Sequence, residues 1–149
     1  MTGQAAWAAL AMGMVLAAGA RADLKAVLAE PNLEKRSKLA MDNAAAAYDT
    51  ARSAYDAGDS KRTGEALHEL QESVEVAYSS LEQTGKDPRK SPKWFKKAEM
   101  ETRELLRRLD GFQNAMSFDD RASVDPVKAK VQQVHDELLL GLMEGKKKK

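Results

Sequence analysis

The chain has 149 residues and a mass of 16.3 kDa, which is enough for one compact domain and too little for two independent hydrophobic cores. Its 24 Lys and Arg residues balance 23 Asp and Glu residues, and a net charge of +1 argues against a uniformly basic nucleic-acid-binding protein. The absence of cysteine excludes disulfide frameworks, thiolate metal sites and thiol catalysis. Abundant Ala, Leu, Glu and Lys beside few aromatic residues predict an all-α fold.

The N-terminal segment has the pattern of a secretory signal peptide. An uncharged, mostly apolar run extends from Ala5 to Ala18 and is followed by the small-x-small triplet Ala20, Arg21, Ala22, which signal peptidase accepts. The apolar run is shorter than the roughly 20 residues that a membrane-spanning helix needs, although an uncleaved anchor is the alternative. We therefore expect cleavage after residue 22, an exported protein that is periplasmic or secreted, and no transmembrane segment after cleavage.

The rest of the chain divides into one short and four long amphipathic segments. Residues 23–31 predict a short lead-in helix that ends at Pro31. A single domain over residues 32–145 follows, with long helices at about 32–57, 60–84, 92–116 and 126–144. Residues 146–149 are four lysines, and we expect this basic tail to be disordered.

Helix boundaries are marked by capping residues, prolines and glycines. Asn32 is suited to cap the first long helix, and Asp59 or Ser60 the second. Gly58 and Gly85 follow the ends of these two helices, where a positive φ costs glycine little. The third and fourth long helices are expected to begin at a capping side chain followed by proline, namely Ser91 with Pro92 and Asp125 with Pro126.

Each long helix carries one stripe of apolar or small residues, which predicts its buried face. In the first the stripe is almost entirely alanine, at positions 40, 44, 47, 51 and 54. In the third it runs from Trp94 to Met116 and would place Trp94 in the core. Four single-striped helices joined by short loops favour an antiparallel up-down four-helix bundle, with stacked helical hairpins as the alternative.

The end of the last helix is apolar on more than one face. Leu139, Leu140 and Met143 lie outside its stripe, so another surface must cover them. The start of the first long helix and the end of the last share one end of such a bundle. We therefore expect the lead-in residues Leu24, Val27 and Leu28 to provide the cover. A homodimer contact or a membrane surface is the alternative.

Positive charge is concentrated at the start of the third long helix. Between Lys86 and Lys97 there are six basic residues and one acidic residue, and the helix face continues with two arginines at three-four spacing. Such a surface favours an anion or an acidic partner, unless a neighbouring acidic helix neutralises it. The candidate partner-binding residues are Lys86, Arg89, Lys90, Lys93, Lys96, Lys97, Arg103 and Arg107.

Catalytic and metal-binding patterns are weak. Glu65 and His68 form the ExxH spacing of di-iron helical bundles, but both point away from the stripe, and Gln132 stands where the other histidine, His135, would need a glutamate. No nucleophile-elbow, Walker or dinucleotide-binding motif is present. We expect no catalytic residue, metal or other cofactor; a metal-binding or enzymatic bundle that uses Glu65 and His68 is the alternative.

One local resemblance offers a further alternative. Residues Ala51, Ala54, Tyr55, Gly58 and Asp59 resemble the first-helix end and turn of a tetratricopeptide repeat, which would imply a helical-hairpin interaction module. The chain departs from that pattern at Thr63 and Glu75, and it has longer helices and no second copy. The interpretation that the residues favour is an exported, non-catalytic helical bundle that acts by surface contact with a protein or an anionic envelope component, without specific nucleic-acid binding.

Overall fold

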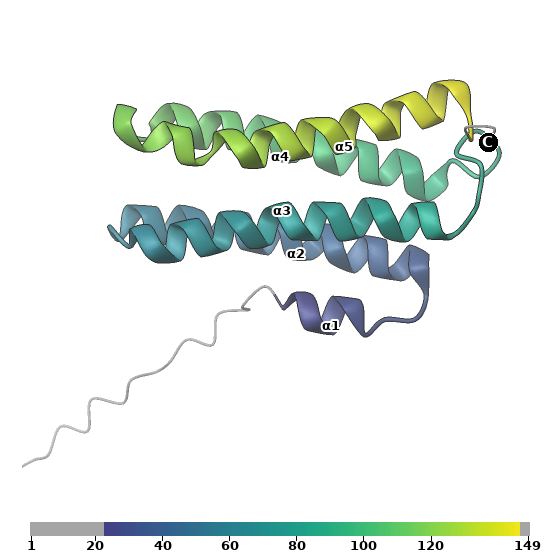
Figure 1. Ribbon diagram of the computed structural model, residues 1–149, viewed down its shortest axis with the longest axis horizontal. Helices are drawn as coiled ribbons and strands as arrows, with labels where there is room; N and C mark the ends of the chain where they lie inside the picture. Colours follow the sequence, from purple (N-terminus) through teal and green to yellow (C-terminus); the bar gives the residue numbers. More distant parts are fainter. Residues whose placement is uncertain (1–22, 147–149) are drawn as a thin grey trace, which may run out of the picture.

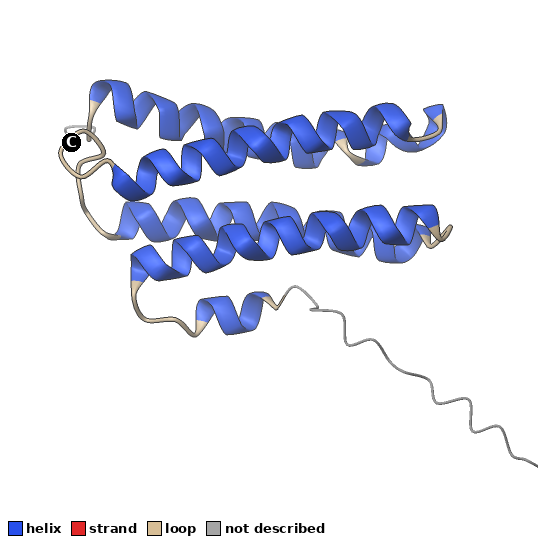
Figure 2. Cartoon of the chain, turned by 180° about the vertical axis from the view of Figure 1, so that it is seen from behind, coloured by secondary structure: helices blue, strands red, loops and turns tan. Residues whose placement is uncertain are grey.

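The computed structural model describes residues 23–146, so the predicted signal peptide over residues 1–22 and the tail residues 147–149 lie outside the described part of the chain. Within residues 23–146 the protein is helical and forms no strand, which confirms the all-α class (Figure 2). The helices are α1 (Leu24–Leu28), α2 (Leu33–Asp56), α3 (Ser60–Gln83), α4 (Lys93–Ala115), the 3-10 helix η1 (Phe118–Ser123) and α5 (Asp125–Glu144). None of these helices combines the length and the apolar character needed to cross a membrane.

The four long helices run side by side as two antiparallel hairpins. Helices α2 and α3 form one layer, α4 and α5 form the other, and the short α1 lies on the outer side of the first layer (Figure 1). Across the two layers, α5 packs mainly on α3, and α4 packs mainly on α2. The end of α3, the start of α4 and the end of α5 therefore meet at one end of the molecule.

The alanine stripe of α2 packs against small residues of α3. Ala40, Ala44, Ala47 and Ala51 are fully buried, and α2 and α3 share the most extensive contact of any two helices. Small side chains allow this because they let two helix backbones approach closely. Asn43 Nδ2 donates to Ser73 Oγ at 2.8 Å, and Ser73 Oγ donates to the carbonyl oxygen of Glu69 at 2.7 Å. A satisfied polar pair inside an apolar interface favours one register of the two helices.

The two layers are joined by larger side chains. Phe112 of α4 is 1% exposed and receives edge-on contacts from Tyr48 and Tyr55 of α2, with ring centroids 6.0 and 5.6 Å away. The Tyr48 hydroxyl donates to the carbonyl oxygen of Arg108 at 3.1 Å. The rest of this core comes mainly from leucine and valine of the other two helices, namely Leu70, Val74, Leu81, Val131, Val134 and Leu138.

The first hairpin has the capping interactions that the sequence predicts. Asn32 Oδ1 accepts a hydrogen bond from the Lys35 amide at 2.9 Å, and Asp59 Oδ1 accepts one from the Arg62 amide at 3.0 Å. The glycine that ends α2, Gly58, has a φ of +74°. Because side chains strongly disfavour this conformation, glycine sharpens the turn between α2 and α3.

The second hairpin begins its helices differently from the prediction. Helices α4 and α5 have no side-chain hydrogen bond at their N-caps, so the expected capping by Ser91 and Asp125 is wrong. Asp125 is already part of α5, and its Oδ1 instead accepts from Gln113 Nε2 at 2.6 Å. This hydrogen bond fastens the start of α5 to the end of α4.

Two predictions about buried residues are also wrong. Phe95, at 5% exposed, takes the core position on α4, while Trp94 is half-buried at the edge of the core.

Helix α1 folds back along α2, on the side away from α5, where Val27 is buried (Figure 1). The Glu30 carbonyl oxygen accepts from Arg36 Nε at 2.8 Å and holds this turn in place. The lead-in residues therefore do not cover the apolar end of α5.

Candidate functional site

The predicted basic residues begin in the loop between α3 and α4, which Asp87 shapes. Asp87 Oδ1 accepts from the Arg89 amide at 2.9 Å, and its carbonyl oxygen accepts from the amides of Lys90 at 3.1 Å and Ser91 at 2.9 Å. Pro88 of the same loop is buried. The loop is thus a compact turn directly before the first turn of α4.

Three of the eight predicted residues are neutralised by carboxylates. Lys86 pairs with Glu34 of α2. Arg103 Nη2 lies 2.8 Å from Glu99 Oε2, and Arg107 Nη2 lies 2.5 Å from Glu104 Oε1, both within α4. The hydrogen bond from Arg107, with smaller contributions from Arg108, lowers the pKa of Glu104 to about 2. The acidic partners therefore come from α2 and α4, and not from α3.

The remaining basic residues form no ion pair within the described chain. Arg89, Lys90, Lys96 and Lys97 are exposed, and within residues 23–146 no carboxylate oxygen lies within 4.0 Å of any of them. Lys93 Nζ lies 5.2 Å from the centre of the Trp94 ring, which is favourable for a cation over an aromatic face. We call Arg89, Lys90, Lys93, Lys96 and Lys97 the basic surface.

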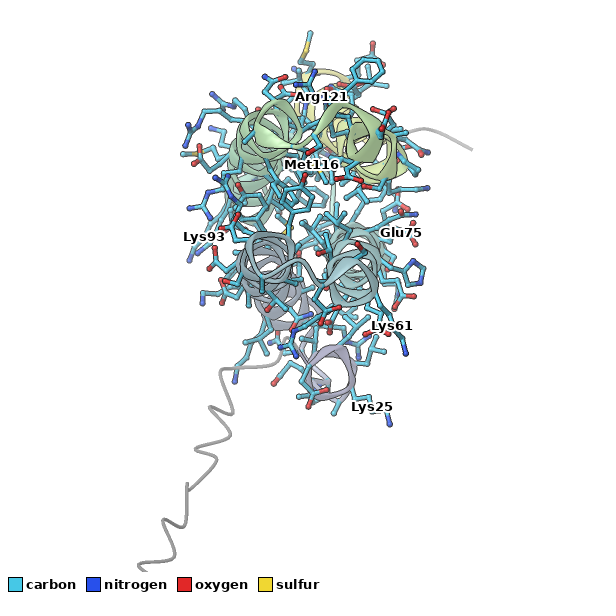
Figure 3. All side chains as sticks on the ribbon, turned by 90° about the vertical axis from the view of Figure 1, so that its left-hand side faces the viewer. Lys25, Lys61, Glu75, Lys93, Met116 and Arg121 are labelled. Atoms are coloured by element: carbon cyan, nitrogen blue, oxygen red, sulfur yellow. The ribbon has the colours of Figure 1, made fainter. Side chains whose placement is uncertain are left out.

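Lys93 of the basic surface lies away from Glu75 of α3. Seen along the helices, Lys93 is on one side of the molecule and Glu75 is on the other (Figure 3). Glu75 Oε1 is 3.6 Å from Lys130 Nζ of α5, so this α3 carboxylate pairs with the neighbouring helix of the other layer. The expectation that acidic α3 might neutralise the basic surface is therefore not met at this position.

Helices α4 and α5 share a buried contact between Glu99 and His135 that the sequence did not predict. Glu99 is 8% exposed; its Oε1 lies 3.0 Å from His135 Nε2, and its Oε2 accepts from Arg103. Burial raises the pKa of Glu99, but the hydrogen bonds and charges of Arg103 and His135 outweigh it and leave this pKa below its ordinary value. Both side chains are hydrogen-bonded to each other, and within the described residues no buried side-chain polar atom lacks a partner, so we interpret the pair as structural.

The weak metal candidates are solvent-facing. Glu65 and His68 are both exposed. His68 Nε2 lies 2.6 Å from Glu72 Oε1, and Glu65 Oε1 lies 3.9 Å from Lys61 Nζ. Within the described residues, no group of three His, Asp or Glu side chains is placed to hold a metal ion. The structure thus brings no third ligand to Glu65 and His68.

The apolar end of α5 is uncovered in the described chain. Leu139, Leu140 and Met143 are 40%, 39% and 67% exposed. Gly145, two residues farther along, lies so close to the side chains of Asp87 and Arg89 that an added Cβ would crowd them. The apolar end and the basic surface therefore lie at the same end of the molecule.

Comparison with known proteins does not assign this chain to a family. A scan against protein-family models and searches of curated proteins and of solved structures found no match to this chain. The tetratricopeptide alternative gains no support from them, and α2 and α3, each of 24 residues, are long for that repeat. A functional proposal therefore has to start from the surface itself.

Proposed function

We propose that this chain is an exported, non-catalytic protein that acts by surface contact. Its four long helices form a closed antiparallel up-down bundle, preceded by the lead-in helix and by a signal peptide over residues 1–22 that is removed on export to the periplasm or the exterior. Two observations support the bundle: each hairpin buries its own stripe, and Phe112 joins the two hairpins through Tyr48 and Tyr55. The partner is an acidic protein or an anionic envelope component.

The observation that carries the proposal is that the five cations of the basic surface form no ion pair within residues 23–146. Its lysines and arginine gather at the start of α4, where backbone amides without a side-chain cap add positive potential. An anionic partner would relieve the repulsion among these cations and would be attracted over about 8–10 Å at physiological salt. Arg103 and Arg107 contribute less, because Glu99 and Glu104 already neutralise them.

The proposal is tested by reversing charges in two matched places. The first variant combines Lys90→Glu, Lys96→Glu and Lys97→Glu, and the control combines Lys25→Glu, Lys61→Glu and Arg62→Glu, which are exposed residues of α1 and α3. Both variants have the same net charge. Retention on an immobilised polyanion and capture of partners from the native host are measured at increasing salt. We expect the first variant to lose salt-sensitive binding and the control to keep it; equal losses would contradict the proposal.

A second copy of the chain is a further candidate partner, supported by the three exposed apolar side chains at the end of α5. Removing a few hundred Å² of apolar surface from water at such a patch is a common reason for self-association. Sedimentation of the wild-type chain and of a Leu139→Ser, Met143→Ser variant tests this. A dimer that the double substitution dissociates supports it, and a wild-type monomer at all concentrations excludes it.

A further inference from the structure

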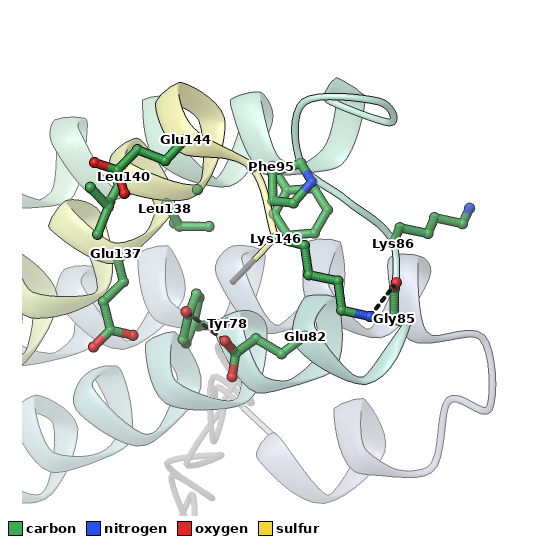
Figure 4. Close-up of a pocket in the computed structure, with 13 residues that line it drawn as sticks. Tyr78, Glu82, Gly85, Lys86, Phe95, Glu137, Leu138, Leu140, Glu144 and Lys146 are labelled. Carbon is green, nitrogen blue, oxygen red and sulfur yellow. Dashed lines mark hydrogen bonds between the residues drawn. The ribbon is translucent and has the colours of Figure 1, made fainter. Parts of the chain in front are cut away.

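A pocket of about 300 Å³ opens where the ends of α3 and α5 meet the loop between α3 and α4. One wall is apolar and consists of Pro88, Phe95, Leu138 and Leu140. The opposite edge carries Tyr78 with Glu82 and Glu137 on either side of it (Figure 4). The pocket thus combines an apolar wall with oxygen atoms that accept hydrogen bonds.

The acidic edge is organised by Tyr78. Its hydroxyl donates to Glu82 Oε1 at 2.7 Å, while Glu137 Oε1 accepts from Gln133 Nε2 at 3.2 Å. Burial, followed by the hydrogen bonds and negative charges of Glu82 and Glu137, raises the pKa of the Tyr78 phenol. The phenol therefore stays neutral, and its oxygen retains the capacity to accept a further hydrogen bond.

The two lysines that line the pocket form no ion pair with this edge. Lys86 pairs with Glu34, which does not line the pocket, and Lys146 Nζ donates to the carbonyl oxygen of Gly85 at 3.0 Å (Figure 4). In the range 23–146, no Lys, Arg or His nitrogen lies within 4.0 Å of a carboxylate oxygen of Glu82 or Glu137. Negative charge in a partly enclosed site beside an apolar wall favours a positively charged ligand over water alone.

We propose that this pocket binds a small organic cation with an apolar body, such as a primary alkylamine. The ammonium group, with its three donors, lies among Glu82, Glu137 and the Tyr78 hydroxyl oxygen. The hydrocarbon part lies against Phe95, Leu138 and Leu140. A volume of about 300 Å³ is at the lower end of ligand pockets, so the ligand is small. A bare metal ion fits less well, because it would leave the apolar wall in contact with water and would face no set of three ligands.

This site shares no residue with the basic surface and does not depend on the binding proposed for that surface. It is tested with three probes of equal length: hexylamine, hexan-1-ol and hexanoate. Each is titrated into the full chain at neutral pH and followed by isothermal titration calorimetry and by amide chemical shifts. We expect saturable binding of one hexylamine, with shifts concentrated at Gly85 and Gly141, and binding of the alcohol and the acid weaker by about tenfold or more. No saturation by hexylamine, or equal binding of the alcohol, would overturn the proposal.

Variants separate the charged and apolar parts of the site. A Glu82→Gln, Glu137→Gln variant keeps the side-chain shape and should bind hexylamine about tenfold more weakly, while the matched control Glu65→Gln, Glu72→Gln on the exposed side of α3 should bind as the wild type does. Leu140→Ser should weaken binding of hexylamine and leave that of methylamine unchanged. Wild-type affinity in the Glu82, Glu137 variant would contradict the proposal. The comparison of probes on the wild-type chain remains decisive if a variant folds poorly.

Discussion

The buried contact between Glu99 and His135 leads to a quantitative prediction about the stability of the second hairpin. The side chains of Glu99 and His135 are only 11% and 13% exposed, whereas Arg103 is 64% exposed, so solvent screens the arginine contact far more. A hydrogen bond to a charged group contributes about 1.5–3 kcal/mol, and a neutral one about 1 kcal/mol. Glu99→Gln keeps the shape and loses the charge. We expect it to lower the free energy of unfolding by about 1–2 kcal/mol at neutral pH.

The sign of the pH dependence follows from the lowered pKa of Glu99. A carboxyl whose pKa is lower in the folded protein stabilises the fold above its unfolded pKa, and this stabilisation is lost as the pH falls through the folded value. The difference between wild type and Glu99→Gln should therefore be largest above about pH 5 and shrink towards pH 3. Urea unfolding followed by circular dichroism measures it. A difference that stays constant over this range would show that the charge of Glu99 does not stabilise the fold.

Glu101, two residues farther along α4, is a matched control with the opposite sign. Burial raises its pKa, Lys97 and Lys38 lower it, and Asp42 raises it, with a net increase. Its charged form therefore opposes folding, and wild-type stability gains from protonation of Glu101 as the pH falls through the raised value. Glu101→Gln should be neutral or stabilising at neutral pH. If Glu99→Gln and Glu101→Gln behaved alike, the environments assigned to these two carboxyl groups would be wrong.

Three further predictions concern the first hairpin and α1. Ala47→Leu places a large side chain in the α2–α3 contact and should cost about 1–3 kcal/mol in thermal unfolding, whereas Ser53→Leu on the exposed face of α2 should leave the melting temperature nearly unchanged. Gly58→Ala should lower the free energy of unfolding by about 1–2 kcal/mol; since no atom lies near the added methyl group, backbone strain at a φ of +74° is the whole cause. Gly64→Ala inside α3, where space is also open, should raise the free energy of unfolding by up to about 1 kcal/mol. Val27→Asp should detach α1 and speed hydrogen exchange over residues 24–28, with exchange at the end of α5 unchanged, since the two regions lie on opposite sides of the molecule.

Local sequence signals were sufficient for the helices themselves and for the first hairpin. The alanine spacing of α2, the capping residues Asn32 and Asp59, and the glycine at position 58 each act within one or two turns, so their effects are visible in the chain. The choice between Trp94 and Phe95 is different. Adjacent positions on a helix differ by about 100° in direction, and only the position of α5 decides which of the two aromatic rings is buried.

Long-range placement accounts for what the sequence analysis missed. The hydrogen bond from Arg36 to Glu30 turns α1 towards the outer side of α2, and nothing in the apolar pattern of α1 distinguishes the two sides. Lys86 pairs with Glu34, which is 52 residues away along the chain, so sequence spacing does not predict this pair. Glu99 and Arg103 are four residues apart on one helix, and spacing does predict that pair. The contact of Glu99 with Arg103 was thus predictable from the sequence. Its contact with His135 depends on the packing of α4 on α5.

Our proposal is that this chain works through contacts made at the start of α4. A photo-crosslinking residue in place of Met100, which is 61% exposed and follows Lys96 and Lys97 by one helical turn, reports those contacts in the native host. The same residue in place of exposed Ser79 of α3 is the control. We expect a discrete adduct from position 100 that mass spectrometry identifies and that high salt diminishes, and no such adduct from position 79. Adducts from position 79 alone, or the same adducts from both positions, would contradict it.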